Sequence, residues 1–138
     1  MTAKEYLGQV EKLDLMIENK LREIDQLKAL SLSVTSHLTP DKVQSSGTKQ
    51  KMAEAIERYI DLENEINECI DQLFDTKKEI ISKIEQLEAK EYNILHLHYI
   101  QYLSFIDIAN KYDKSYSWVS DLHTKAIKSF EDKFFLKL

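Results

Sequence analysis

A seven-residue repeat of apolar positions runs through the middle of this chain and limits what it can fold into. The residues at this interval are Met52, Tyr59, Ile66, Leu73, Ile80 and Leu87. A companion series is formed by Ala55, Leu62 and Cys69, so one face of a long helix is apolar. Because the chain has only one proline and two glycines, it has few places to turn. We predict an all-α protein with one long helix over residues 50–87.

A second long helix is predicted at the N-terminus, over residues 2–32. Its apolar residues also repeat at intervals of seven, as Val10, Ile17 and Ile24, with Tyr6, Leu13 and Leu27 in the companion series. The segment 33–49 contains the proline, a glycine and many serines and threonines, so it predicts a loop. The two helices then fold back as an antiparallel hairpin of coiled-coil type, which is our predicted first domain, residues 1–87.

The apolar stripe on the 50–87 helix is wider than one partner helix requires. The residues that widen it are Ile56, Ile70, Phe74, Ile81 and Ile84. A two-helix seam needs only a narrow stripe, and a lone hairpin leaves this flank in water. We therefore predict a homodimer through the hairpin, most simply a four-helix bundle.

The cysteine and histidine residues give no pattern typical of catalysis or metal binding. Cys69 is the single cysteine and lies on the apolar stripe, which favours a buried structural thiol in a reducing, cytoplasmic compartment. His96 and His98 point about 200° apart on a helix, so they cannot bind one metal ion together. His37 has no candidate ligand near it. We predict no enzyme activity, no cofactor, no metal and no membrane segment.

The C-terminal residues 88–138 have the pattern of a small three-helix domain. A helix over residues 90–103 leads into a shorter one from Ser104 to Tyr112, where Ser104 and Asp107 form a Ser-x-x-acid start signal. Ser115 is a good N-cap for the last helix, and Asp113 tolerates the positive φ that a tight corner needs. This is the helix-turn-helix pattern. The alternative is two amphipathic helices joined by a polar corner with no such role.

The charge is unevenly divided along the chain. The net charge is −5, yet residues 90–138 hold seven lysines and six acidic residues, a balance of +1 that leaves −6 for residues 1–89. Since salt-dependent affinity grows with the number of phosphates neutralised, one C-terminal domain alone is expected to bind DNA weakly.

The tract from Leu87 to Glu131 resembles region 4 of bacterial sigma factors, the part that reads the −35 promoter element. Its sequence is LEAKEYNILHLHYIQYLSFIDIANKYDKSYSWVSDLHTKAIKSFE. The shared features are the Ile108–Ala109 pair, Ser115 at the start of the last helix, Val119, and Lys125-Ala126-Ile127. With the MTAKEYL start, the coiled-coil body and the VQSSG element (43–47), the full chain resembles phage-encoded transcriptional regulators, grouped with the ArpU-like and RinA-like late-gene activators.

The resemblance implies a DNA-reading surface on the last helix. Its base-facing residues would be Tyr116, Ser117, Trp118, Ser120, Asp121 and Thr124, and its phosphate-facing residues Lys111, Lys114, Lys125 and Lys128. Sigma-type recognition helices usually present arginines here, and this one has none, which argues against a −35-like target. For Tyr116 and Trp118 the alternative is that they close the core of the domain.

Two functions follow from these patterns. The first is a phage or prophage transcriptional regulator that binds double-stranded DNA as a dimer. The second is a protein-interaction adaptor that docks on host RNA polymerase or another phage protein, which the acidic body and the arginine-free helix favour.

Overall fold

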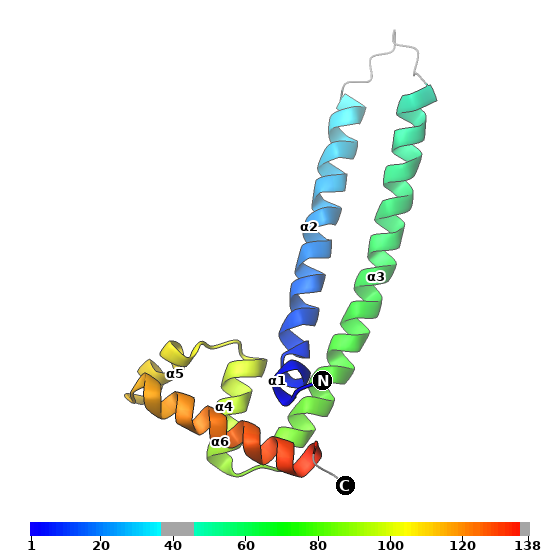
Figure 1. The fold of residues 1–138 in the computed structure, drawn as a ribbon. Coiled ribbons are helices and arrows are strands. Elements are labelled where there is room, and N and C mark those ends of the chain that lie inside the picture. The colour runs from blue at the N-terminus through cyan, green and yellow to red at the C-terminus, as the bar shows by residue number, and fades with distance from the viewer. Residues whose placement is uncertain (37–45, 136–138) are drawn as a thin grey trace. The chain divides into compact units, whose positions relative to one another are not determined.

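The described residues of this protein, 1–36 and 46–135 of the computed structural model, form helices joined by short turns and contain no strand (Figure 1). The predicted all-α class is confirmed. The helices are α1 (Ala3–Leu7), α2 (Gln9–Ser36), α3 (Ser46–Ile84), α4 (Ala89–Leu95), the π-helical turn η1 (His96–Ile100), α5 (Phe105–Tyr112) and α6 (Tyr116–Phe134). None of these helices is long and apolar enough to cross a membrane.

The chain divides into two compact units. Residues 15–71 form one, here called the paired-helix unit, and residues 1–14 with those from 72 onward form the other, the head unit. This division differs from the predicted domain boundary between residues 87 and 88. The physical reason is that Leu7, Val10, Ile80 and Ile84 are buried in the same apolar core as the C-terminal helices.

The paired-helix unit consists of the facing parts of α2 and α3, which run antiparallel. Its small core is made of Ile24, Leu62 and Ile66, all at least 93% buried. Cys69 is a free thiol that is also buried, as the repeat predicted. Burial of one apolar stripe on each helix is the main stabilising term for such a pair, because long isolated helices gain little stability from propensity alone.

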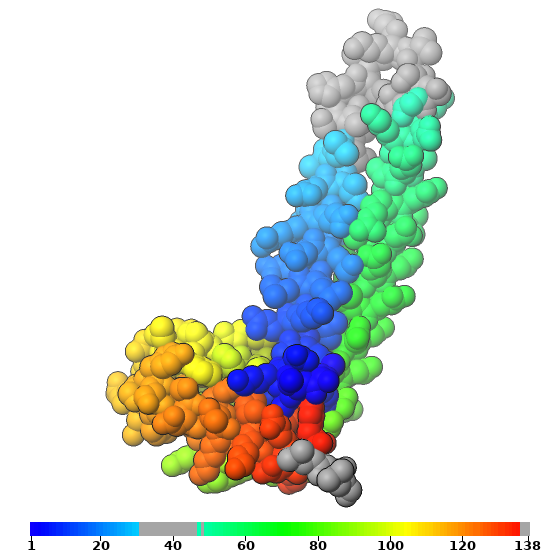
Figure 2. Space-filling model, viewed as in Figure 1, coloured from blue at the N-terminus to red at the C-terminus, as the bar shows by residue number. Residues whose placement is uncertain are grey.

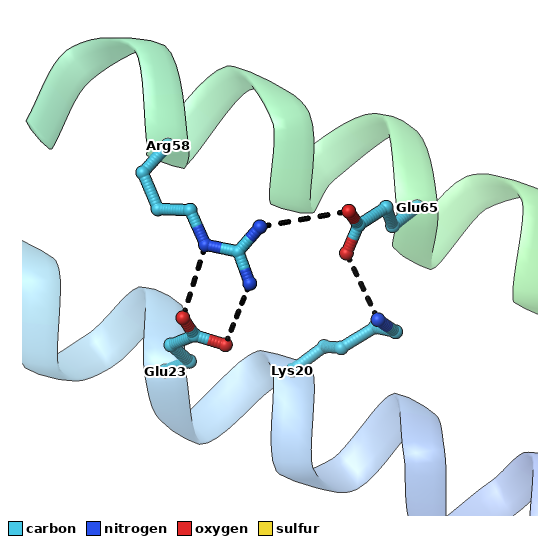
Figure 3. A network of polar contacts seen from close by, with 4 residues as sticks. All are labelled: Lys20, Glu23, Arg58 and Glu65. Atoms are coloured by element: carbon cyan, nitrogen blue, oxygen red, sulfur yellow. Dashed lines mark hydrogen bonds and ion pairs between the residues drawn. The ribbon is translucent and has the colours of Figure 1, made fainter. Parts of the chain in front are cut away.

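Four charged side chains join α2 to α3 beside this core (Figure 3). Arg58 donates two hydrogen bonds to the carboxylate of Glu23, at 3.1 and 3.2 Å, and lies 3.5 Å from a Glu65 oxygen. The Lys20 ammonium donates to Glu65 at 2.9 Å. The hydrogen bond from Lys20 lowers the pKa of Glu65, and the hydrogen bond to Glu23 raises the pKa of Arg58. A bidentate Arg–carboxylate pair fixes the relative register of two helices.

The first helix and the loop differ from the prediction. Gly8 separates α1 from α2, although its φ of −74° stays in the helical region and its carbonyl accepts from the Lys12 amide at 3.2 Å. Helix α2 extends to Ser36 and α3 begins at Ser46, so both ends of the predicted loop 33–49 are helical. Serine and threonine lower helix propensity only modestly, which does not stop a long helix. Residues 37–45, with His37 and most of the 43–47 element, lie outside the described residues.

Helices α3 and α4 are separate. Helix α3 ends at Ile84 instead of the predicted Leu87, and residues 85–88 form a turn before α4 starts at Ala89. The predicted helix over 90–103 is shorter and changes character at His96, where the backbone widens into the π-helical turn η1. The helix ends at Ile100. Two residues later, Tyr102 has a φ of +62°, and its hydroxyl donates to the Asp14 carboxylate.

The core of the head unit surrounds Phe130, a fully buried side chain of α6. The Tyr6 ring of α1 lies 5.9 Å from the Phe130 ring, and the first residues of the chain pack against α6 in Figure 2. The Tyr6 hydroxyl also accepts from Lys83 of α3 at 2.9 Å and donates to Glu79 at 2.8 Å. The head is therefore completed by the N-terminal helix and the end of α3, in addition to α4, α5 and α6.

Candidate nucleic-acid interface

Helix α5 begins with the capping pattern that the sequence predicted. The Ser104 hydroxyl accepts from the Asp107 amide at 3.1 Å, and the Asp107 carboxylate accepts from the Ser104 amide at 3.2 Å. This reciprocal pair satisfies two backbone donors that would otherwise lack partners at the start of the helix.

The corner between α5 and α6 is short because one residue reverses the chain. Asp113 has φ +52° and ψ +45°, the left-handed conformation that the sequence predicted for this position. Ser115 then caps α6, its hydroxyl accepting from the Trp118 amide at 3.0 Å. These local bonds fix where α6 starts and hence which of its residues face outward.

The inner face of α6 is buried against the other helices of the head unit. Its buried residues are Val119, His123, Ala126, Ile127 and Phe130. On α5, Ile108 and Ala109 are buried, as expected for the contact between the two helices. Residues three and four positions apart share one face of a helix, so the opposite face of α6 points to solvent.

The outer face of α6 carries most of the residues predicted to contact DNA. Ser117, Asp121, Thr124, Lys125 and Lys128 are exposed. The neighbouring Ser120 is half-buried, and its carbonyl accepts from the Thr124 hydroxyl at 3.0 Å. The structure thus brings these predicted residues together on one polar surface, with two ammonium groups and several hydroxyl groups.

Tyr116 and Trp118 have different positions at the edges of this surface. Tyr116 is 57% exposed, with its ring 5.8 Å from that of Phe105. Trp118 is half-buried and lines a cavity with residues of α4 and α5, so its ring belongs partly to the packing of the head. The Lys114 ammonium, in the corner, lies 5.6 Å from the centre of the Trp118 ring. Lys111, at the end of α5, is also exposed, near the Tyr112 ring.

A buried histidine lies directly behind this surface. His123 is 5% exposed, and its Nε2 atom is hydrogen-bonded to the Tyr99 hydroxyl at 2.8 Å. Burial, with smaller effects from His98 and Lys4, lowers the pKa of His123 to about 4. Burial also raises the pKa of Tyr99 to about 12. Both groups are uncharged at neutral pH, and their role is to pack α6 onto η1.

The surface has almost no net charge. Up to Lys128, four exposed lysines, at 111, 114, 125 and 128, face the carboxylates of Asp107, Asp113 and Asp121. The last turns of α6 add Lys133 against Glu131 and Asp132, so the two helices and their corner hold five lysines and five carboxylates. Both arginines of the chain, Arg22 and Arg58, lie in the paired-helix unit. The surface therefore offers hydroxyl groups and point charges instead of guanidinium forks.

Sequence reasoning missed the residues that share the cavity with Trp118. These include Lys90 and Asn93 of α4, Tyr112 of α5 and Leu122 of α6. Their spacing along the chain gives no signal, because three helices bring them together.

No protein-family model, curated protein or solved structure matches this chain. A functional assignment therefore rests on the geometry and chemistry of the surface itself.

Proposed function

We propose that this protein is a transcriptional regulator of the phage-encoded type that binds double-stranded DNA through α5 and α6. The observation that carries the proposal is the arrangement of these two helices. Each is capped by a serine, they meet at a left-handed Asp113, and α6 has a buried inner face and a polar outer face. A helix so presented has the form of a recognition helix that enters the major groove.

The chemistry of the outer face supports a division of roles. Lys125 and Lys128 are point charges that neutralise phosphates and position the head without reading sequence. Near the start of α6, Ser117 and Ser120 offer hydroxyl groups to base edges, and Asp121 is suited to accept from the amino group of a cytosine. Because no arginine is present, a bidentate contact to guanine is not expected.

Self-association would compensate for the weak charge of one head. In the paired-helix unit Ile56, Ile60 and Ile70 are 56%, 50% and 47% exposed. The spacing of four and ten residues places them on one face of α3, beside the stripe that packs against α2. Covering this face with the same face of a second copy gives the predicted four-helix bundle, and two linked heads then bind with a raised effective concentration.

The direct test is selection of bound fragments from a random DNA pool at low and moderate salt, followed by sequencing. We expect a motif with two half-sites, which Ser117→Ala and Ser120→Ala alter. Lys125→Gln should weaken binding to all sequences and reduce the slope of log affinity against log salt by about 1. Lys77→Gln, an exposed lysine of α3 with the same charge change, is the matched control. Absence of any enriched sequence at low salt would refute the proposal.

The dimer is tested separately by sedimentation equilibrium. The double variant Ile56→Glu and Ile60→Glu is expected to shift the protein toward monomer and to reduce the selected motif to one half-site. A control with Glu54→Gln and Glu57→Gln changes neighbouring exposed positions of the same helix. A wild-type protein that is monomeric at high micromolar concentration would exclude this pairing.

A protein-interaction adaptor is the second candidate, in which the head docks on host RNA polymerase or another phage protein. The observation that favours it is Ile106 of α5, which is 61% exposed. An isoleucine side chain cannot hydrogen-bond to phosphate, but it can pack against an apolar surface of a partner protein. Pull-down from host lysate with wild-type protein and Ile106→Ser distinguishes the two. Recovery of a stoichiometric partner by the wild type alone supports docking, and recovery of none rejects it.

A further inference from the structure

The head unit contains a cavity of about 330 Å³ that opens to solvent between α4, α5 and α6. Its floor is aliphatic: Ile94, Leu97 and Ile108 are each at least 98% buried and line it. Leu122 and Trp118, both half-buried, form a wall from α6. A cavity of this size is at the lower end of the range of about 300–1,000 Å³ found for small-molecule sites, and an apolar floor with few polar groups is typical of them.

The rim of this cavity is cationic. Lys90 and Lys114 are its only charged lining residues, and both are exposed. Within the part of the chain that the structure describes, neither ammonium lies within 4.0 Å of a carboxylate. A ligand that reaches both the floor and the rim therefore meets positive charge that no described side chain neutralises.

A polar pair completes the rim between the two lysines. The Asn93 side-chain amide donates to the Tyr112 hydroxyl at 2.7 Å. The tyrosine oxygen uses a lone pair in this bond, so its own O–H is left to donate to a ligand. The rim thus combines one hydroxyl donor with two ammonium groups, a set of donors that suits an oxygen anion.

We propose that this cavity binds a small organic anion with an aromatic or branched aliphatic body and one carboxylate. The body lies on the aliphatic floor and against the Trp118 ring, and the carboxylate lies at the rim, facing Lys90, Lys114 and the Tyr112 hydroxyl. Burial of the apolar body supplies most of the affinity, and the charged rim supplies the selectivity for an anion. This site does not depend on DNA binding, although Lys114 belongs to both surfaces, so a bound anion competes there with phosphate.

The test uses the full chain labelled with ¹⁵N and the indole N–H signal of Trp118, the only tryptophan of the protein. The probes are 3-phenylpropionate and its uncharged isostere 3-phenylpropanamide, titrated at constant ionic strength. We expect the carboxylate to shift the signal saturably and to bind at least about threefold more tightly than the amide, a modest factor because both lysines are exposed to solvent.

Variants separate the rim from the floor. Lys90→Gln and Lys114→Gln are each expected to reduce the preference for the carboxylate, whereas Lys78→Gln, an exposed lysine of α3 outside the cavity with the same charge change, leaves it intact. Leu122→Phe should fill the cavity and weaken both probes. If that variant fails to fold, the three lysine variants, all at exposed positions, still decide the question.

Three results would overturn the proposal. The first is no saturable shift of the Trp118 signal with either probe. The second is equal affinity for the carboxylate and the amide, which would make the cavity an apolar cleft without selectivity for anions. The third is an unchanged preference in both Lys90→Gln and Lys114→Gln.

Discussion

Acid should destabilise the head unit through one residue, His123. Its ring is buried against Tyr99, Phe105 and His98, with the His98 ring centre 5.5 Å and the Phe105 ring centre 4.9 Å away. The Tyr99 hydroxyl is hydrogen-bonded to the Nε2 atom of His123. The positive charge of the nearby Lys4 further disfavours a protonated His123 ring. No carboxylate is among the groups that set the pKa of His123, so protonation places an uncompensated charge in the core.

The sign and size of the effect follow from the two pKa values. Burial lowers the pKa of His123 from its ordinary 6.5 to about 4 in the folded protein. Between these values the unfolded chain binds a proton that the folded chain does not, so the free energy of unfolding falls as the pH falls. Each pH unit of this window is worth about 1.4 kcal/mol, which gives a loss of about 2 kcal/mol by pH 5 and about 3 kcal/mol at the lower end. Above pH 7 the contribution is constant.

Urea unfolding followed by Trp118 fluorescence measures this loss, because Trp118 and His123 are in the same unit. The curves are recorded for wild type and His123→Gln at pH 7, 6 and 5. Glutamine does not titrate, and its side-chain oxygen can accept from the Tyr99 hydroxyl. The pKa of His96 is also lowered by burial and acts in the same pH window, but it is retained in both proteins and cancels in the comparison.

The test compares how much the free energy of unfolding of each protein falls with pH. We expect wild type to lose about 2 kcal/mol more than His123→Gln between pH 7 and pH 5. Equal losses in the two proteins would refute the reasoning, since they would show that His123 is protonated in the folded state at no cost.

Three further perturbations test other parts of the fold. Leu7→Ala should lower the free energy of unfolding of the head unit by about 2–5 kcal/mol, because this fully buried side chain of α1 belongs to its core. Leu15→Ala, at a half-exposed position, should change the free energy of unfolding by less than about 1 kcal/mol, and chemical denaturation measures both variants. Asp113→Gly should be neutral or raise the midpoint of thermal unfolding, and Asp113→Val should lower it by several degrees, because a β-branched residue is strained at φ +52°; equal midpoints would show that the corner rearranges. The coupling between Glu23 and Arg58, measured with a double-mutant cycle, should be favourable at low salt and shrink at 1 M salt, since both side chains are partly exposed.

Local signals in the sequence were enough to locate the corner and the outer face of the candidate site. Ser104, Asp107 and Ser115 cap helices through bonds to residues three positions away, so their effect depends only on the neighbouring sequence. Asp113 adopts the left-handed conformation for an equally local reason. The polar residues of α6 alternate with buried ones at helical spacing, and this spacing alone assigns them to the solvent side.

Partners of the buried faces were not predictable in the same way. Periodicity shows that Leu7, Val10, Ile80 and Ile84 are buried but not what covers them, and the structure places all four in the core of the head unit. The division of the chain consequently differs from the predicted boundary. The π-helical turn at His96 had no sequence signal, because a single widened turn results from the packing of the surrounding helices.

The sequence by itself determined the all-α class, the seven-residue stripe, the caps, the left-handed corner and the polar face of α6, since each depends on residues a few positions apart. Only the tertiary structure decided which segments complete the head, how deeply Trp118 is buried, and that Lys90, Asn93 and Tyr112 meet around one cavity. The physical reason is that a sequence pattern reports the local environment of a residue, whereas a core or a cavity depends on contacts between segments far apart in the chain.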